Sequence, residues 1–143
     1  MRVALANGVR LNWREDGDPQ GVPVVFANSL GTDLRLWDQV VPLLPAGLRL
    51  IRYDKRGHGL SDCPPAPYAM DDLVTDAEAL LAVLGIESCV FVGLSIGGMI
   101  GQGLAARRPD VLALRVAHGD RVARVAQDLA EVLHVFVVRP AVL

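Results

Sequence analysis

Three short apolar runs, each able to form a strand, alternate along this chain with segments of helical periodicity. The first and third runs are almost wholly apolar, as strands covered on both faces are. The segments between the runs place apolar residues three or four positions apart. This alternation is typical of a parallel sheet with helices on both faces. The predicted strands are residues 22–29, 48–54 and 89–95, and the predicted helices are residues 33–44, 71–85 and 96–108.

The two ends of the chain add smaller elements to this α/β pattern. Near the start, two alternating runs meet at Asn7-Gly8, a strong local signal for a hairpin, which predicts an antiparallel pair at the edge of the sheet. After Asp110 the pattern predicts a possible strand, helix and strand. We therefore expect a mostly parallel sheet with an N-terminal antiparallel hairpin.

Composition narrows the class of protein. In 143 residues, 52 % are hydrophobic, which is enough for one domain with a buried core. The net charge of −2 gives no reason to expect nucleic acid or an anionic membrane as a partner. The two cysteines, Cys63 and Cys89, form neither a disulfide framework nor a zinc motif, so a cytoplasmic setting is expected. Residues 89–106 are uncharged, but their glycines fit a buried strand and helix better than a membrane span.

A serine stands where the third strand meets its helix, within the sequence Gly-Leu-Ser-Ile-Gly. With no loop between strand and helix, Ser95 would take strained backbone angles, and Gly93 and Gly97 would let the two elements approach. The hydroxyl would then stand above the sheet as a nucleophile, with the Ile96 amide able to bind an oxyanion. The competing interpretation is a serine that caps the helix, with glycines that serve only packing.

A second oxyanion donor is expected from the loop after the first strand. Leu30 is the candidate, since its amide lies in that loop and Gly31 gives the backbone room to turn. The competing interpretation is an ordinary strand-to-helix turn. Gly101, Gly103 and Ala106 also match a dinucleotide fingerprint, but they lie inside a predicted helix rather than at the end of a strand.

Three stretches of the sequence resemble the α/β-hydrolase superfamily, and within it most resemble the 3-oxoadipate enol-lactonases. They read NSLGTDLRLWD, RYDKRGHGLSD and GLSIGGMIGQ, within a similarity that covers roughly residues 8–110. The resemblance implies a serine hydrolase that opens a small carboxylate-bearing lactone in aromatic catabolism, through an acyl-enzyme and without metal or organic cofactor. It also implies that Ser95 is the nucleophile and that the backbone amides of Leu30 and Ile96 bind the oxyanion.

The general base of such a hydrolase should be a histidine that follows the serine and an acidic residue. His58 precedes Ser95 and belongs to a turn. His118 and Asp120 follow the possible strand at 111–116, where they are either the partners of the serine or a polar turn. His134 opens the last apolar run and is better explained as a strand-end residue.

The resemblance stops near Asp110, which leaves residues 111–143 as a divergent tail. We expect a partial α/β-hydrolase fold without the cap and C-terminal half, either as a genuine short ending or, as we favour, through out-of-frame translation. Such a chain would hydrolyse its substrate poorly and would associate with itself through exposed apolar surface. The alternatives are a non-catalytic truncated fragment and another carboxylic ester hydrolase of the same fold.

Overall fold

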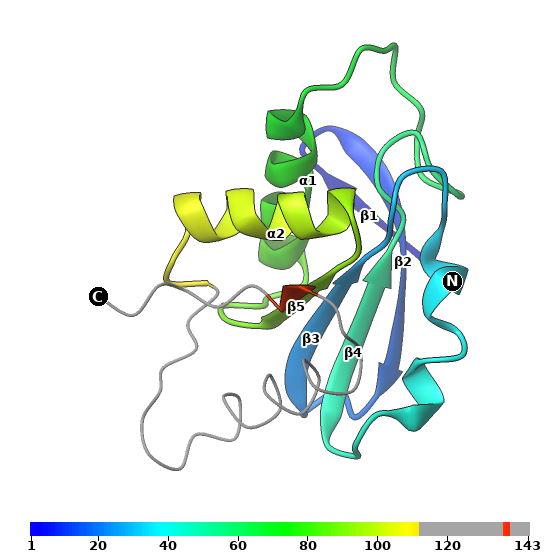
Figure 1. Ribbon diagram of the computed structural model, residues 1–143, viewed down its shortest axis with the longest axis vertical. Coiled ribbons are helices and arrows are strands. Elements are labelled where there is room, and N and C mark those ends of the chain that lie inside the picture. Colours follow the sequence, from blue (N-terminus) through cyan, green and yellow to red (C-terminus); the bar gives the residue numbers. More distant parts are fainter. Residues whose placement is uncertain (112–135, 138–143) are drawn as a thin grey trace.

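The computed structural model describes residues 1–111 and 136–137 of the chain. Its strands form one mixed sheet in the order β1-β2-β4-β3-β5-β6 (Figure 1). The strands β3, β4 and β5 are parallel to one another, and the remaining neighbours in the sheet are antiparallel. The strands are β1 (Arg2–Ala6), β2 (Val9–Gly17), β3 (Val22–Ala27), β4 (Leu48–Tyr53), β5 (Val90–Gly93) and β6 (Phe136–Val137).

The predicted α/β fold with a mostly parallel centre is confirmed, and so is the N-terminal hairpin. Asn7 and Gly8 both have positive φ, 52° and 73°, as the tight turn between two twisted strands requires. The hairpin pairs β1 with β2 and then joins the sheet through β4. The last predicted strand is represented by β6, while the predicted elements between residues 112 and 135 lie outside the described residues.

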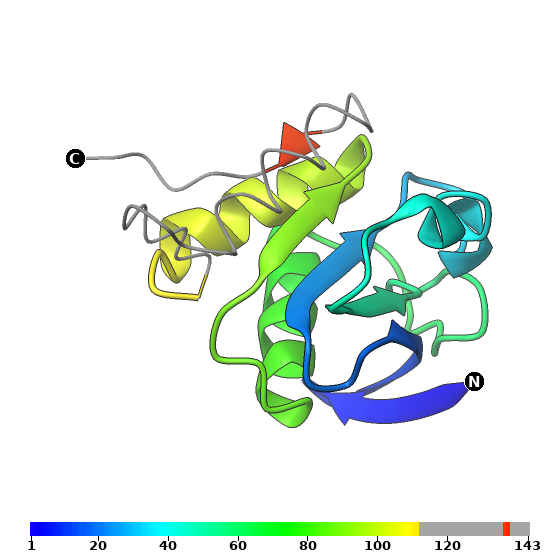
Figure 2. The ribbon, with the colours of Figure 1, turned by 90° about the horizontal axis from the view of Figure 1, so that it is seen from below.

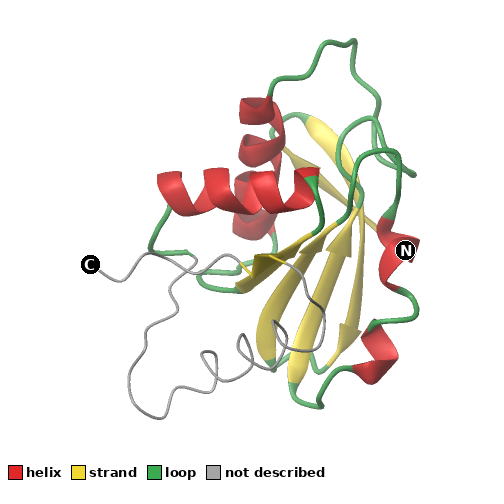
Figure 3. Ribbon diagram, viewed as in Figure 1, coloured by secondary structure: helices red, strands yellow, loops and turns green. Residues whose placement is uncertain are grey.

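Helices lie on both faces of the sheet, but they differ in kind. The α-helices α1 (Met70–Val83) and α2 (Ile96–Arg107) pack together on one face, over Val25, Ile51 and Phe91 (Figure 2). The other face is covered by two short 3-10 helices, η1 (Leu34–Trp37) and η2 (Val41–Leu43) (Figure 3).

The single α-helix predicted at residues 33–44 is therefore wrong. Asp33 caps the start of this segment by accepting a hydrogen bond from the amide of Arg35, and Trp37 packs on the sheet against Phe26. Pro42 has no N–H for an α-helical hydrogen bond and its ring crowds the preceding turn, so the helix breaks into two pieces.

The helix α1 ends at Val83, slightly before the predicted end at residue 85, and Gly85 follows its C-cap in the left-handed conformation that stops a helix. Its φ of 64° reverses the chain, and its amide donates to the carbonyl of Ala82 while that of Ile86 donates to Leu81. The helix α2 contains Gly101, Gly103 and Ala106, so they form no phosphate loop. A Cβ at Gly103 would lie 2.6 Å from a methyl of Val74, so this glycine serves the packing of α2 on α1.

Two buried arginine side chains connect β4 and the loop after it to neighbouring segments of the chain. The Arg52 guanidinium, on β4, binds Asp16 on β2 at 2.7 Å and Asp38 after η1 at 2.6 Å. The Arg56 guanidinium binds Asp76 of α1 through two bonds of 2.6 Å. Paired and hydrogen-bonded in this way, these groups avoid the cost of an isolated buried charge.

The burial of Cys89 gives a direct test of how β5 packs. Burial raises the pKa of the Cys89 thiol to about 12, whereas Cys63 is exposed. Because the thiolate is the reactive form, we expect iodoacetamide to modify Cys63 and to spare Cys89 until the protein is unfolded. Mass spectrometry of peptides from native and urea-treated protein measures this. Equal labelling of both cysteines in the native protein would contradict the packing.

Candidate functional site

Ser95 occupies the sharp corner between β5 and α2. The strand ends at Gly93 and the helix begins at Ile96, so the chain turns within two residues. Ser95 takes φ 54° and ψ −119°, a strained conformation for a residue with a side chain, and it is exposed. Gly93 pairs with Ala27 at the end of the parallel strand β3. The corner therefore lies at the carboxyl edge of the sheet, where ligands of such sheets bind.

The geometry of Ser95 differs from that of a serine that caps a helix. A capping serine has an extended backbone, and its hydroxyl accepts an amide hydrogen bond from the first turn. The Ser95 side chain makes no such bond, and instead its carbonyl accepts the amides of Gly98 and Met99. Within the described part of the chain, the hydroxyl is thus available for other chemistry.

Gly93 and Gly97 have no room for a side chain. A Cβ on Gly93 would lie 2.3 Å from the carbonyl carbon of Gly97. A Cβ on Gly97 would lie 2.0 Å from the carbonyl oxygen of Ala27. These contacts involve backbone atoms, which cannot move aside as a flexible side chain does. The corner depends on both glycines.

The two predicted oxyanion donors come from segments at this same edge. Leu30 lies in the loop that follows β3, and Ile96 is the first residue of α2. The amide of Leu94 donates to Ala27 at 3.0 Å, which extends the pairing of β3 and β5 up to the corner. Among the described residues, neither the Leu30 nor the Ile96 amide donates a hydrogen bond to the protein. Within that part of the chain, both amides are available to a ligand.

Lys55, directly after β4, is part of this region and was missed by the sequence analysis. It is buried, and its Nζ donates to the carbonyls of Asn28 at 2.8 Å and Ser29 at 3.2 Å. Burial lowers its pKa to about 8, while the Asp54 carboxylate acts in the opposite direction. One feature of the sequence could have pointed to this residue. Lys55 is the single lysine of the chain, and it stands at the end of a predicted strand.

His58 lies in the turn where the sequence places it, with both ring nitrogens engaged. Its Nε2 accepts the amide of Gly31 at 3.2 Å, and its Nδ1 lies 3.0 Å from the carbonyl oxygen of Arg56. These contacts give the ring a structural partner on each side. His118, Asp120 and His134 lie outside the described residues.

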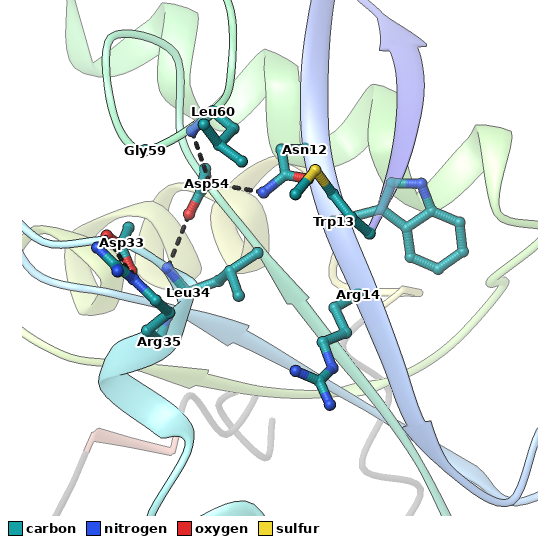
Figure 4. A pocket seen from close by; sticks show the side chains of 10 residues that line it. Asn12, Trp13, Arg14, Asp33, Leu34, Arg35, Asp54, Gly59 and Leu60 are labelled. Carbon is teal, nitrogen blue, oxygen red and sulfur yellow. Dashed lines mark hydrogen bonds and ion pairs between the residues drawn. The ribbon is translucent and has the colours of Figure 1, made fainter.

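The buried Asp54 carboxylate connects three segments around the edge of the sheet. It accepts the amides of Leu34 at 2.7 Å and Leu60 at 3.0 Å, and the side-chain amide of Asn12 at 2.8 Å (Figure 4). Asp54 lines a cavity of about 570 Å³ that does not include Ser95. This carboxylate serves to hold the surrounding loops.

Comparison with known proteins identifies the family. Residues 22–124 match the family described as the alpha/beta hydrolase fold. The chain is 42 % identical over 105 residues to 3-oxoadipate enol-lactonase 2 of Acinetobacter baylyi, covering 73 % of this chain and 39 % of that protein. It is 35 % identical over 97 residues to a non-heme chloroperoxidase of Streptomyces lividans, covering 67 % of this chain and 35 % of the relative.

A solved structure agrees with these matches. The crystal structure of the enol-lactonase from Burkholderia xenovorans superimposes with a TM-score of 0.74 at 42 % identity, covering 77 % of this chain and 43 % of that one. The chain belongs to the alpha/beta hydrolase fold family. The resemblance to enol-lactonases seen in the sequence is confirmed, and the chain spans about two fifths of the length of these relatives. No helix in residues 1–111 and 136–137 is long and apolar enough to cross a membrane.

The glycines of the corner yield a matched pair of variants. Gly97→Ala forces a methyl into the Ala27 carbonyl, so we expect a loss of about 3 kcal/mol in the free energy of unfolding. Gly85→Ala meets no atom within 4 Å and has only its positive φ to disfavour it, so we expect a loss of about 1 kcal/mol. Urea unfolding of both variants measures the difference. Equal losses would show that the contact with Ala27 carries no special cost.

The lowered pKa of Lys55 predicts a pH dependence. Below pH 8, Lys55 is charged in the folded and unfolded states, and its burial disfavours folding. Between about 8 and the ordinary 10.5, the unfolded state binds a proton that the folded state has lost, so the free energy of unfolding rises with pH. We expect wild type to gain stability relative to Lys55→Met across this window, in urea titrations at several pH values. Cys89 titrates in both proteins, so its contribution cancels in the difference between their free energies of unfolding. A difference that stays constant across the window would contradict the lowered pKa of Lys55.

Proposed function

We propose that Ser95 is the nucleophile of a carboxylic ester or lactone hydrolase, and that the backbone amides of Leu30 and Ile96 bind the oxyanion. The single observation that carries the proposal is the conformation of Ser95. The residue holds a strained positive φ at the carboxyl edge of the sheet while its exposed hydroxyl caps nothing among the described residues. Strain of this kind persists where the surrounding structure requires it, and it is common at reactive residues.

The names of two relatives support a proposal for the substrate class. Two of them are named enol-lactonases, so we propose a small lactone, of the kind opened in aromatic catabolism, as the substrate. Ser95 Oγ would attack the lactone carbonyl, and the amides of Leu30 and Ile96 would stabilise the charge on its oxygen. The ring C–O bond would then break to give an acyl-enzyme, while the leaving enol becomes a ketone. Water would finally release the acid and regenerate the serine.

The base that activates Ser95 is proposed to come from outside the described residues. His58 is the one histidine within them, and its ring contacts Gly31 and Arg56. His118 with Asp120 is one candidate in this chain. The other candidate is a segment equivalent to the part of the relatives that this chain does not match.

A chimera tests the nucleophile. Residues 1–111 are joined to the part of the Burkholderia xenovorans enol-lactonase that follows the matched region, and lactone hydrolysis is followed spectroscopically. We expect activity in the chimera and its loss by about 10⁴-fold or more in Ser95→Ala, because the nucleophile and its base act as a unit. Ser88→Ala, an exposed serine at the opposite end of β5, is the matched control and should keep full activity.

The unmodified chain of 143 residues is assayed beside the chimera. We expect turnover far below that of the chimera, because His58, the one histidine among the described residues, has both ring nitrogens in contact with the backbone and leaves Ser95 unactivated. Turnover equal to that of the chimera would place the base within this chain and make His118 the first residue to replace. Activity of the chimera that survives Ser95→Ala would remove the nucleophile assignment.

A further inference from the structure

Two side chains from the loop after β4 hold two consecutive peptide groups in the loop after β3. The Lys55 ammonium donates to the carbonyl of Ser29 at 3.2 Å, and the Nε2 of His58 accepts the amide of Gly31 at 3.2 Å. The residue between these two peptide groups is Leu30, whose amide is a proposed oxyanion donor. Both contacts bridge more than twenty positions of the chain, so they join separate loops.

The first contact determines where the Leu30 amide points. The Ser29 carbonyl and the Leu30 N–H belong to one peptide group, and this group is trans. In a planar trans peptide these two bonds point in opposite directions. The Ser29 oxygen is turned inward, where it accepts from Lys55 and also from the hydroxyl of Thr32 at 2.9 Å. The Leu30 N–H is consequently turned away from the buried ammonium.

The second contact holds the far side of the same residue. The Gly31 amide shares a peptide group with the Leu30 carbonyl, and its donation to His58 sets the plane of that group. Gly31 has a φ of 72°, which lets the chain turn there. With one peptide plane held on each side, the orientation of Leu30 is determined although its side chain is exposed.

We propose that Lys55 and His58 are positioning residues that together aim the Leu30 amide at the oxyanion formed at Ser95. The inference rests on the proposed function, and it assigns roles to two side chains that do not touch the substrate. Lys55 is suited to its role because it is buried, and a hydrogen bond from a buried ammonium is electrostatically stronger than one made in water. His58 is suited because a neutral imidazole carries one donor and one acceptor nitrogen.

The geometry specifies the tautomer of His58. The Arg56 carbonyl near Nδ1 is only an acceptor, and the Gly31 amide near Nε2 is only a donor. The ring must therefore carry its proton on Nδ1 and leave Nε2 free. Long-range proton–nitrogen NMR on the full chain, at a pH where the ring is neutral, reads this tautomer without any activity. A proton on Nε2 would overturn the role of His58.

A phenylboronic acid tests the aim of the Leu30 amide. Boron has an empty orbital that accepts an electron pair from the Ser95 oxygen, so this adduct forms without the general base that turnover requires. The hydroxyl proton passes to the solvent, and the tetrahedral adduct carries a negative charge that imitates the oxyanion. In wild type we expect the amide proton signals of both Leu30 and Ile96 to shift on binding, and the binding to be lost in Ser95→Ala. The Ile96 amide belongs to α2 and is the internal reference, since neither Lys55 nor His58 contacts it.

The variant Lys55→Met removes the bonds to the Asn28 and Ser29 carbonyls, and His58→Phe removes the contacts with the Gly31 amide and the Arg56 carbonyl. We expect both to keep the Ile96 shift, to lose the Leu30 shift, and to bind the boronic acid about 100-fold more weakly, as loss of one oxyanion donor predicts. His58→Gln, whose side-chain oxygen can accept the Gly31 amide, should restore the Leu30 shift. Arg35→Met, which removes an exposed cation near the same loop, is the matched control and should bind like wild type.

The outcomes separate the positioning role from the proposed function. Absence of a Ser95 adduct in wild type would overturn the proposed function and this inference with it. An adduct that shifts Ile96 but not Leu30 in wild type, or a Leu30 shift that survives in both variants, would overturn the positioning role alone. If Lys55→Met does not fold, the positioning role is tested by His58→Phe and His58→Gln alone. A Leu30 shift that is lost in the first and kept in the second supports it, and the same shift in both contradicts it.

Discussion

The close approach of α2 to the end of β3 is the constraint on which the rest of this structure depends. The helix can begin one residue after the corner only because Gly97 lies against the Ala27 carbonyl and Gly93 lies against Gly97. That approach sets Ser95 at the carboxyl edge, with its amide neighbour Ile96 at the start of the helix. It also brings the corner beside the loop that follows β3, because β3 and β5 are adjacent and parallel. The chemistry proposed for this edge is a consequence of backbone packing.

Buried polar side chains stabilise the face of the sheet that lies opposite the α-helices. Among the described residues, the face opposite the α-helices is covered by η1 and η2, which are too short to stabilise themselves through internal hydrogen bonds. Arg52 and Asp54 compensate for this, since Arg52 binds Asp38, the residue directly after η1, and Asp54 binds the amide of Leu34, the first residue of η1. Buried ion pairs contribute modestly to stability when they replace apolar contacts. Here they fix the position of short segments that have little apolar surface of their own.

Much of this could be predicted from the sequence, because the apolar runs and the turn residues act locally. The hairpin at Asn7-Gly8, the end of α1 before Gly85 and the corner at Ser95 each follow from residues within a few positions. The helix at residues 33–44 was predicted wrongly because the periodicity of its apolar residues outweighed the effect of Pro42. The roles of Lys55 and Asp54 could not be predicted, since their partners are separated from them by six to more than forty positions. Pairings of this kind become visible only after the sheet has brought the loops together.

The burial of the chain's single lysine also determines how the molecule responds to reagents that modify amines. Most proteins of this size carry several exposed lysines, and dyes, cross-linkers and activated surfaces attach to them at random. Here the one side-chain amine lies beneath the loop after β3, where it donates to the carbonyls of Asn28 and Ser29. Reagents that acylate lysine side chains will therefore leave the folded protein almost untouched. The same reagents will modify Lys55 once the two loops separate, so the extent of labelling reports on whether these loops are joined.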